Sequence, residues 1–546
     1  MLPRRLRGRR IFPAATILPM NAPNAIPPAA AAPAASSAVV SIVDAVQLAL
    51  NQFQTGNRAE VEALCLKIME VEPEHPDALH LTGVLAHLAG KQGIALALIE
   101  KAVRINPAHA QYQYNLGVVY GVLRRTDAAL AAYREAARLD PAHVSVWLNL
   151  GNALLEVDRL DEAIDAYQQH LKVKPHDAAA TLALAIALYS ARRFDLARTH
   201  YENSVALAAA DARAHWEYAH WLLMTRDFAR GWEEYECRFA ALGSNVWNYP
   251  YPFARWEGEA LAGKTIILHG EQGLGDEIMF ASIYLEVMAQ ARHVIICCQP
   301  HLAALFRSSF PGATIHDQLR ADEDAWTRRP VPWLNTTAPI HYQIPFGSLA
   351  RLRRRTSESF PRHTGYLKAD VAKVAVWAGK LGHLSGKRVG LCWAANPAIQ
   401  DAVAARRSRK KSLTLQALEP LLEVPGAHFV SLQTWEAARQ VADAAPATRT
   451  RVLDVSADLQ DFSDTAALMM NLDLIITVDT SVAHLAGALG RPVWILLPWQ
   501  ADWRWHDTGE TTEWYPSARL YRQPAIDDWD AVVNQAKKEL RREVKA

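Results

Sequence analysis

The sequence predicts an α-helical solenoid followed by two doubly wound α/β domains, and three observations predict it. Small residues and prolines recur at a fixed interval through the first half of the 546-residue chain. Short β-branched runs separated by helical stretches fill the second half, which is typical of buried parallel strands. Two of those runs end in turns where open α/β sheets commonly bind ligands.

An internal repeat predicts the helical half. Prolines recur at intervals of 34 residues, the period of tetratricopeptide repeats, and each is expected to end the second helix of a pair. The prolines are Pro73, Pro107, Pro141 and Pro175; small residues share one phase at Gly83, Gly117, Gly151, Ala185 and Ala219; a third phase holds Ile99, Tyr133, Tyr167, Tyr201 and Tyr235. We therefore predict a degenerate capping unit and five repeats over residues 42–240.

The concave face of such a solenoid can hold an extended chain. Asn115 and Asn149 recur there one period apart, and an asparagine side chain can both donate to and accept from a peptide unit. Here the repeats resemble the superhelix of the O-linked N-acetylglucosamine transferases, whose asparagine ladder holds peptide backbone. In the alternative, both asparagines only cap and solvate the helix surface.

Composition narrows the class of protein. Half of the residues are apolar and the formal net charge is +1, so no strong field attracts nucleic acid or an anionic membrane. The five cysteines form no CxxC pair and no Cys/His metal spacing, and no apolar run reaches the length of a membrane span. These features favour a soluble, reduced, cytoplasmic protein that binds no nucleic acid.

The remaining boundaries follow from shifts in composition. Residues 1–41 are rich in proline and alanine and are expected to be a disordered tail, although a targeting peptide, or translation from Met20, stays open. Residues 241–263 are predicted as a linker and 370–386 as a linker helix. The two α/β domains are predicted over 264–369 and 387–523, and a C-terminal helix over 524–546.

The first candidate site is the turn "GEQGLGD" after the run "TIILH". Its glycines, among them Gly273 and Gly275, permit close approach of a ligand to backbone, and N–H groups at the following helix start favour an anion. Asp276 lies at the rim of this turn. A glycine turn with acidic first-turn residues also occurs without any ligand, so that alternative stays open.

The second candidate site lies in "LIITVDTSVAHLAGALGRPVWILLP". A strand ends at Asp479, Thr480 and Ser481 begin a helix, and His484 follows one turn later. Hydroxyls and free N–H groups at a helix start suit a phosphate or diphosphate, and the histidine adds a possible donor. A simple N-cap at Asp479 or Thr480 is compatible with the same pattern.

Together these two segments resemble the heptosyltransferase-like (family 9) glycosyltransferases, specifically the bacterial class in which tetratricopeptide repeats precede the transferase. The segments "RGWEEYECRF", "GLCWAANP" and "WYPSARLYRQ" extend the likeness. It implies a GT-B fold of two Rossmann-like domains, no metal or other cofactor, a nucleotide-sugar held by the second domain and an acceptor nearer the first. It also implies that Asp276 is the general base. The donor diphosphate is expected to contact Asp479, Thr480, Ser481 and His484, with Ser481 in the place of the family's glycine. It is also expected to contact Lys411, although the register of that lysine is uncertain.

Other residues are weaker candidates. Asn396 and Gln433 follow strands and could contact the donor. An ordinary turn explains Asn396 equally well, and a glutamine at a strand end such as Gln433 is more often simply solvated. Trp499, Trp503 and Trp505 either line the cleft or pack the domain. The triplet "DED" at 322–324 lies in a polar stretch rather than at a strand end, which argues against a metal-binding DxD motif.

The predicted function is transfer of a sugar from a nucleotide-sugar to an acceptor. The fused solenoid suggests a protein acceptor, such as flagellin or another surface protein. A non-catalytic scaffold with a degenerate transferase domain is the main alternative, and a nucleotide-sugar epimerase with the same two-domain fold is a weaker one. The sequence does not identify the sugar, the nucleotide, the acceptor or the oligomeric state.

Overall fold

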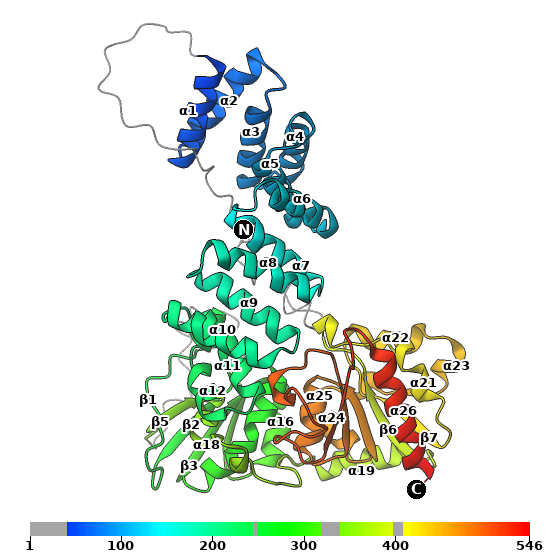
Figure 1. Cartoon of the computed structure of the whole chain (residues 1–546). Coiled ribbons are helices and arrows are strands. Elements are labelled where there is room, and N and C mark those ends of the chain that lie inside the picture. The colour runs from blue at the N-terminus through cyan, green and yellow to red at the C-terminus, as the bar shows by residue number, and fades with distance from the viewer. Residues whose placement is uncertain (1–40, 244–245, 247, 318–338, 397–407, 546) are drawn as a thin grey trace, which may run out of the picture. The chain divides into compact units, whose positions relative to one another are not determined.

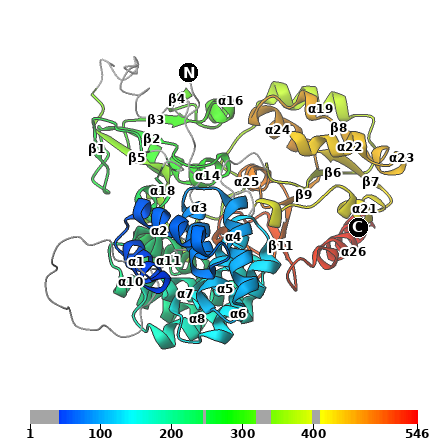
Figure 2. The same ribbon diagram turned by 90° about the horizontal axis from the view of Figure 1, so that it is seen from above.

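The computed structural model describes residues 41–243, 246, 248–317, 339–396 and 408–545. Two compact units divide the chain, one ending at Ala210 and the other beginning at Asp211. Over its described residues the first contains helices and no strand, and the second contains both sheets (Figures 1 and 2). Residues 1–40 of the predicted tail and the "DED" triplet lie outside the described residues.

The first unit is a stack of antiparallel helix pairs, as the 34-residue period predicts. Its helices are α1 (Ile42–Gln54), α2 (Arg58–Val71), α3 (Pro76–Leu88), α4 (Gln92–Ile105), α5 (Ala110–Val122), α6 (Thr126–Leu139), α7 (Val144–Glu156), α8 (Leu160–Val173), α9 (Ala178–Ser190) and α10 (Phe194–Leu207). Each predicted proline stands two residues beyond the end of a second helix. The solenoid fold is thus confirmed.

Small residues set how closely the two helices of a pair approach. A Cβ atom added at Gly117 would lie 2.6 Å from the ring of Tyr133, and one added at Gly151 would lie 2.5 Å from the ring of Tyr167. The recurring small and aromatic residues therefore meet within a pair. Each of these tyrosines packs against the glycine of its own helix pair, not between one pair and the next.

In the turn between the two helices of each pair, one residue at an equivalent position has a positive φ angle. Positive φ angles recur every 34 residues, and the residues that adopt them are Gly56, Gly90, Arg124, Asp158, Arg192 and Arg226. Because glycine holds only the first two places, the packing of the pair imposes this backbone conformation on side chains that rarely adopt it.

The second unit begins with the last helix pair, α11 (Ala212–Met224) and α12 (Phe228–Tyr235), and the short α13 (Arg238–Leu242). The fifth predicted repeat therefore belongs to the compact unit that contains the sheets. The indole N–H of Trp232 on α12 donates to the carbonyl of Arg354 at 2.7 Å, and the ring is fully buried. This pair is built into the α/β region.

The first lobe contains a parallel sheet in the order β1-β5-β2-β3-β4. Its strands are β1 (Ala254–Arg255), β2 (Thr265–His269), β3 (His293–Cys298), β4 (Thr314–Asp317) and β5 (Tyr342–Pro345); its helices are α14 (Leu274–Phe280), α15 (Tyr284–Met288), α16 (Pro300–Ser309) and α18 (Phe346–Arg353). The two central strands β2 and β3 are the predicted apolar runs.

The second lobe contains a parallel sheet in the order β11-β10-β9-β6-β7-β8. Its strands are β6 (Lys387–Cys392), β7 (Ala427–Ser431), β8 (Val452–Asp454), β9 (Leu474–Val478), β10 (Val493–Leu497) and β11 (Ala518–Arg522); its helices are α21 (Glu419–Leu422), α22 (Arg439–Asp443), α23 (Pro446–Arg449), α24 (Phe462–Met469), α25 (Ser481–Ala488) and α26 (Trp529–Lys545). The linking helix α19 (Val371–Leu381) packs on α24. Two doubly wound domains are thus confirmed.

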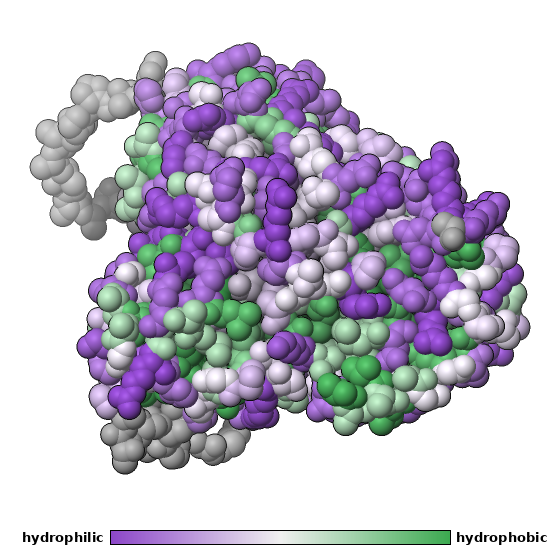
Figure 3. All heavy atoms as spheres, turned by 90° about the horizontal axis from the view of Figure 1, so that it is seen from below, coloured by the Kyte–Doolittle hydropathy of each residue, from purple (hydrophilic) through white to green (hydrophobic). Residues whose placement is uncertain are grey.

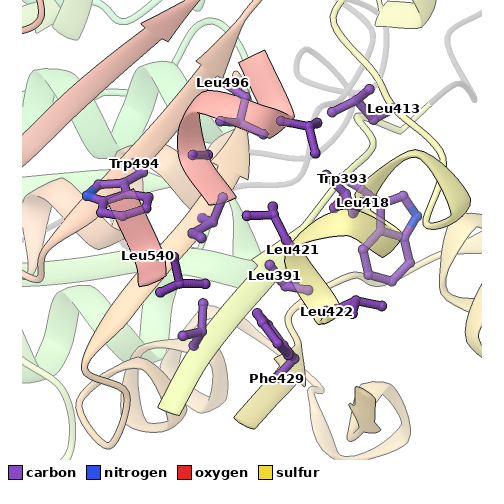
Figure 4. Close-up of a cluster of buried hydrophobic side chains, with 14 of the residues drawn as sticks. Leu391, Trp393, Leu413, Leu418, Leu421, Leu422, Phe429, Trp494, Leu496 and Leu540 are labelled. Carbon is purple, nitrogen blue, oxygen red and sulfur yellow. The ribbon is translucent and has the colours of Figure 1, made fainter. Parts of the chain in front are cut away.

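The core of the second lobe lies between its sheet and the C-terminal helix. Leu391 and Phe429 from the strands, Leu421 from α21 and Leu540 from α26 belong to one buried cluster (Figure 4). Burying a leucine or phenylalanine side chain stabilises a fold by about 1.5–3 kcal/mol. The C-terminal helix is therefore an integral part of this lobe.

The surface mixes apolar and polar side chains. On the face in Figure 3, apolar residues gather in two areas with polar residues between them. Val371 on α19 and Trp435 after β7 are 82% and 63% exposed. Within the described ranges no helix is both long and apolar enough to cross a bilayer.

Candidate functional site between two helix starts

The first helix start, at α14, is capped by one of its own side chains. The N–H of Gly273 donates to Oδ2 of Asp276 at 3.1 Å, which is half of a capping box, since glycine has no side chain to complete it. A Cβ atom at Gly270 would lie 2.3 Å from Oε1 of Glu277, whose carboxylate is buried and accepts from the backbone N–H of Gln299 at 3.0 Å. The glycine turn thus makes room for the carboxylates of Glu277 and Asp276.

Helix α13 and the last helix pair support this turn from outside the sheet. The guanidinium of Arg238 donates to both carboxylate oxygens of Glu271, at 2.8 and 2.9 Å, and both side chains are fully buried. Burial opposes the charged form of Arg238, but the carboxylates of Glu271 and Glu236 outweigh it and raise the pKa. Tyr235 also accepts from the side chain of Gln272 at 2.9 Å.

The second helix start, at α25, follows β9. Thr480 caps the helix and its Oγ1 accepts from the N–H of Val482 at 3.3 Å, while Ser481 opens the first turn. The carboxylate of Asp479 is nearly buried and accepts from Nζ of Lys411 at 3.1 Å. The predicted lysine therefore lies beside the predicted diphosphate segment.

His484 is buried one turn into α25. Its Nδ1 lies 2.8 Å from the hydroxyl of Tyr515, and its ring stacks on that of Trp505 with centroids 5.1 Å apart. Burial lowers the pKa of His484 to about 4, so the imidazole is neutral near pH 7. It can therefore take part in hydrogen bonding without carrying charge.

The two helix starts meet. A Cβ atom added at Gly275 on α14 would lie 2.8 Å from Cδ2 of His484 on α25 and 3.6 Å from Cα of Ser481. Figure 2 shows the two helices side by side between the sheets. Asp276, the next residue along α14, thus stands close to the start of α25.

Arg504 joins this site from the loop after β10, and the sequence patterns do not single it out. Its guanidinium pairs with Asp276 of the first lobe and with Asp502. Burial opposes its charge, but the carboxylates of Asp502 and Asp276 outweigh that effect and raise the pKa of Arg504. A fixed positive charge therefore lies beside the predicted base.

Gln433, a predicted donor contact, forms hydrogen bonds within the fold. Its buried carboxamide oxygen accepts from the N–H groups of Trp393 and Ala394, at 3.1 and 2.9 Å. Its nitrogen donates to the carbonyls of Ala394 and Thr434, at 3.0 and 3.2 Å. The side chain thus holds the loops after β6 and β7 together.

The remaining candidates separate into exposed and buried residues. Asn396 is exposed, and its carbonyl accepts from Ser408 at 3.2 Å. Trp503 and Trp505 are buried and Trp499 is half-buried. Of the three tryptophans, Trp505 contributes directly to the site because it stacks on His484.

The two repeat asparagines are engaged inside the solenoid. The amide nitrogen of Asn115 donates to Nε2 of His80 at 2.8 Å, and that of Asn149 donates to the hydroxyl of Tyr114 at 2.9 Å. Both side chains are buried. Each therefore ties its helix to the preceding pair, unlike either arrangement expected from the sequence.

Two residues near the site, neither of them glycine, adopt backbone angles that are otherwise essentially restricted to glycine. Trp435 has φ 62° and ψ −157°, and His506 has φ 57° and ψ −179°. Each such residue costs about 1–3 kcal/mol. His506 is fully buried and pairs with Glu513, whereas the ring of Trp435 is exposed.

Comparisons with known proteins agree with this architecture. The tetratricopeptide repeat model matches residues 89–143 and 114–180, and the model of glycosyltransferase family 9 (heptosyltransferase) matches residues 433–497, which include β9, α25 and β10. The chain combines tetratricopeptide repeats with a family 9 glycosyltransferase segment. The predicted resemblance is thus confirmed.

A curated relative, protein FlbA of Caulobacter vibrioides, is 30% identical to this chain over 329 residues, which cover 59% of this chain and 53% of the relative. The chain thus spans about half the length of that relative.

Solved structures of other proteins resemble part of the chain. A MamA mutant is 21% identical with a TM-score of 0.28, and the match covers 30% of this chain and 96% of that chain. PilF of Pseudomonas aeruginosa is 23% identical with a TM-score of 0.31, over 37% of this chain and 87% of that chain. YrrB is 18% identical with a TM-score of 0.29, over 32% of this chain and 90% of that chain. Among the described residues of this chain, no three His, Cys, Asp or Glu side chains are grouped as a metal site requires.

Proposed function

We propose that the chain transfers a sugar from a nucleotide-sugar donor to an acceptor hydroxyl. The observation that carries this proposal is the close approach of α14 and α25 at Gly275 and His484. It brings a carboxylate from one lobe beside a helix start suited to diphosphate in the other. The family 9 match, which covers the second of these segments, supports the same reaction class.

The donor would bind at the second lobe. The first N–H groups of α25 and the hydroxyl of Ser481 suit the diphosphate oxygens, and Lys411 supplies a nearby positive charge. His484 would serve as a neutral hydrogen-bonding group because its pKa is low. These groups would stabilise the charge that grows on the leaving diphosphate.

The acceptor would be activated at the first lobe. Asp276 would take the proton of the acceptor hydroxyl while the acceptor oxygen bonds to the anomeric carbon and the bond from that carbon to the diphosphate oxygen breaks. Arg504 would hold the carboxylate in place. In this scheme Lys411 and Arg504 supply the positive charge, so we propose a metal-independent reaction.

We further propose that the acceptor is a cytoplasmic protein recruited by the repeats. Tandem repeats of this class present extended curved surfaces to partners. Because Asn115 and Asn149 are engaged within the stack, recruitment would depend on other side chains. Incubation of the full chain with labelled nucleotide-sugars and a cell extract should place label in the protein fraction; label only in lipid or free sugar would argue against a protein acceptor.

The central experiment replaces Asp276 with asparagine. Asp276→Asn should reduce transfer by at least about 100-fold while nucleotide binding persists, because the amide can still cap α14 but cannot accept the proton. Asp464→Asn is a matched control, since Asp464 closes the capping box of α24 and also pairs with a lysine.

The control variant should retain transfer. An Asp276→Asn protein as active as the native chain would rule out Asp276 as the base. A native chain that binds nucleotide-sugars but transfers to no acceptor would instead support the scaffold alternative.

A further inference from the structure

Trp435 lies at the same edge of the second sheet as the proposed donor site. Strands β9, β6 and β7 are neighbours, and their carboxyl ends lead to Thr480, Trp393 and Gln433. Side chains link these ends: Sγ of Cys392 lies 3.9 Å from Oγ1 of Thr480 and 3.4 Å from Oε1 of Gln433. With strands about 4.8 Å apart, β7 lies about 10 Å from β9.

The backbone around Trp435 is held on both sides. Before it, the carboxamide of Gln433 donates to the carbonyl of Thr434 at 3.2 Å. After it, the carbonyl of Trp435 accepts from the N–H of Ala438 at 3.2 Å. The surrounding chain thus imposes a conformation on Trp435 that glycine would adopt without strain.

His506 shows what usually offsets such strain. It shares the unfavourable backbone angles, but its ring is fully buried, pairs with Glu513 and lies 3.3 Å from the carbonyl of Met224. Trp435 exposes 63% of its surface. The fold therefore gains much less from this tryptophan than from His506, and an observed outlier of this kind points to a functional site.

We propose that Trp435 is the stacking platform for the nucleobase of the donor. This inference rests on the proposed function, because it places on Trp435 the base of the same nucleotide whose diphosphate is proposed to bind at α25. An indole face stacks on any base, so the platform supplies affinity for nucleotides as a class and leaves base identity to other contacts.

The test measures binding of the full chain to UDP, GDP, ADP and CDP and to inorganic pyrophosphate by calorimetry. Trp435→Ala should weaken the tightest nucleoside diphosphate by about 10-fold and leave pyrophosphate within about 2-fold. Trp435→Phe, which keeps an aromatic face, should stay within about 3-fold of the native chain.

The outcomes separate this inference from the proposed function. If the native chain binds neither pyrophosphate nor any nucleotide, the donor site itself is wrong and the inference falls with it. If nucleotides bind the native chain and Trp435→Ala equally well, or if pyrophosphate weakens as much as nucleotides do, the stacking role is wrong while the donor site stands.

A stability measurement completes the test. Both Trp435→Gly and Trp435→Ala remove the ring, but only glycine relieves the backbone, so Trp435→Gly should have a Tm about 2 °C or more above that of Trp435→Ala. His506→Gly should lower Tm by about 5 °C, because it removes buried contacts. A Trp435→Gly protein no more stable than Trp435→Ala would contradict the strain on which the inference is built.

Discussion

The two strand-to-helix turns of the site have the same topology but different supports. The turn from β2 to α14 presents Asp276 and is held from outside its sheet by Arg238, on a helix that follows the last repeat pair. The turn from β9 to α25 presents a helix start beside Lys411 and is held by residues of its own lobe. The proposed base thus depends on the preceding helices, whereas the proposed donor site is self-contained.

The largest expected effect comes from removing the external support. Arg238→Met leaves the carboxylate of Glu271 buried without its partner, which should reduce the free energy of unfolding by about 3–5 kcal/mol. Denaturant titration of the full chain measures it. Arg542→Met is the control, because its pair with Glu539 is an exposed helix pair and should contribute less than about 1 kcal/mol.

If Arg238→Met and Arg542→Met reduced the free energy of unfolding equally, Arg238 would not be an important support of the turn. A loss of transfer in Arg238→Met at temperatures where the protein stays folded would support that role, since the variant residue lies outside the cleft.

The next effect is a pH dependence within the second turn. Because burial holds the pKa of His484 at about 4, the unfolded chain binds a proton between pH 6.5 and 4 that the folded site does not. This contribution is therefore complete above pH 6.5 and is lost as pH falls towards 4, by up to about 3 kcal/mol. His484→Gln should flatten the fall of Tm between pH 6.5 and 4.5.

The first lobe offers the comparison for that measurement. Burial also lowers the pKa of His269, at the end of β2, to about 4. His269→Gln should therefore flatten the same pH profile. Native and His484→Gln profiles of equal slope would show that His484 does not titrate in this range.

The smallest of the three stability effects comes from the contact between the turns. In Gly275→Ala the new methyl group would lie 2.8 Å from the ring of His484, which should cost about 1–3 kcal/mol. Transfer should fall by about 100-fold because the two helix starts are displaced. Assays of transfer and Tm on the same preparation measure both.

Gly379→Ala on α19 is the matched control, because a methyl group there meets nothing within 4 Å. It should leave transfer unchanged and raise stability by about 0.5–1 kcal/mol. Full activity in Gly275→Ala would show that the close approach of α14 and α25 is not needed for the reaction.

The sequence predicts the central elements of the fold because they carry strong periodic signals. The 34-residue interval places the helix pairs, and the apolar runs place β2, β3, β6, β7, β9 and β10. The edge strands β4 and β8 are short and partly exposed, and β11 alternates polar with apolar residues, so none of them forms an apolar run.

The site is predictable only where its residues belong to local motifs. Asp276, Thr480 and His484 lie in the two quoted segments, and Lys411 comes from the family resemblance. Arg504 reaches the same region from a segment that no pattern singles out, whereas Arg238 and Tyr515 lie in segments that extend the family likeness but to which it assigns no role. Conversely, Gln433, Asn115 and Asn149 have the residue type of ligand-binding groups, but their hydrogen bonds are used within the fold.

The pair α11–α12 has a consequence for how such proteins vary. Trp232 and its neighbours anchor this pair to the first lobe, whereas helix pairs earlier in a solenoid contact mainly their immediate neighbours. Whole repeats could be gained or lost ahead of residue 211 without altering the two strand-to-helix turns, so the length of the solenoid and the proposed chemistry are free to diverge independently.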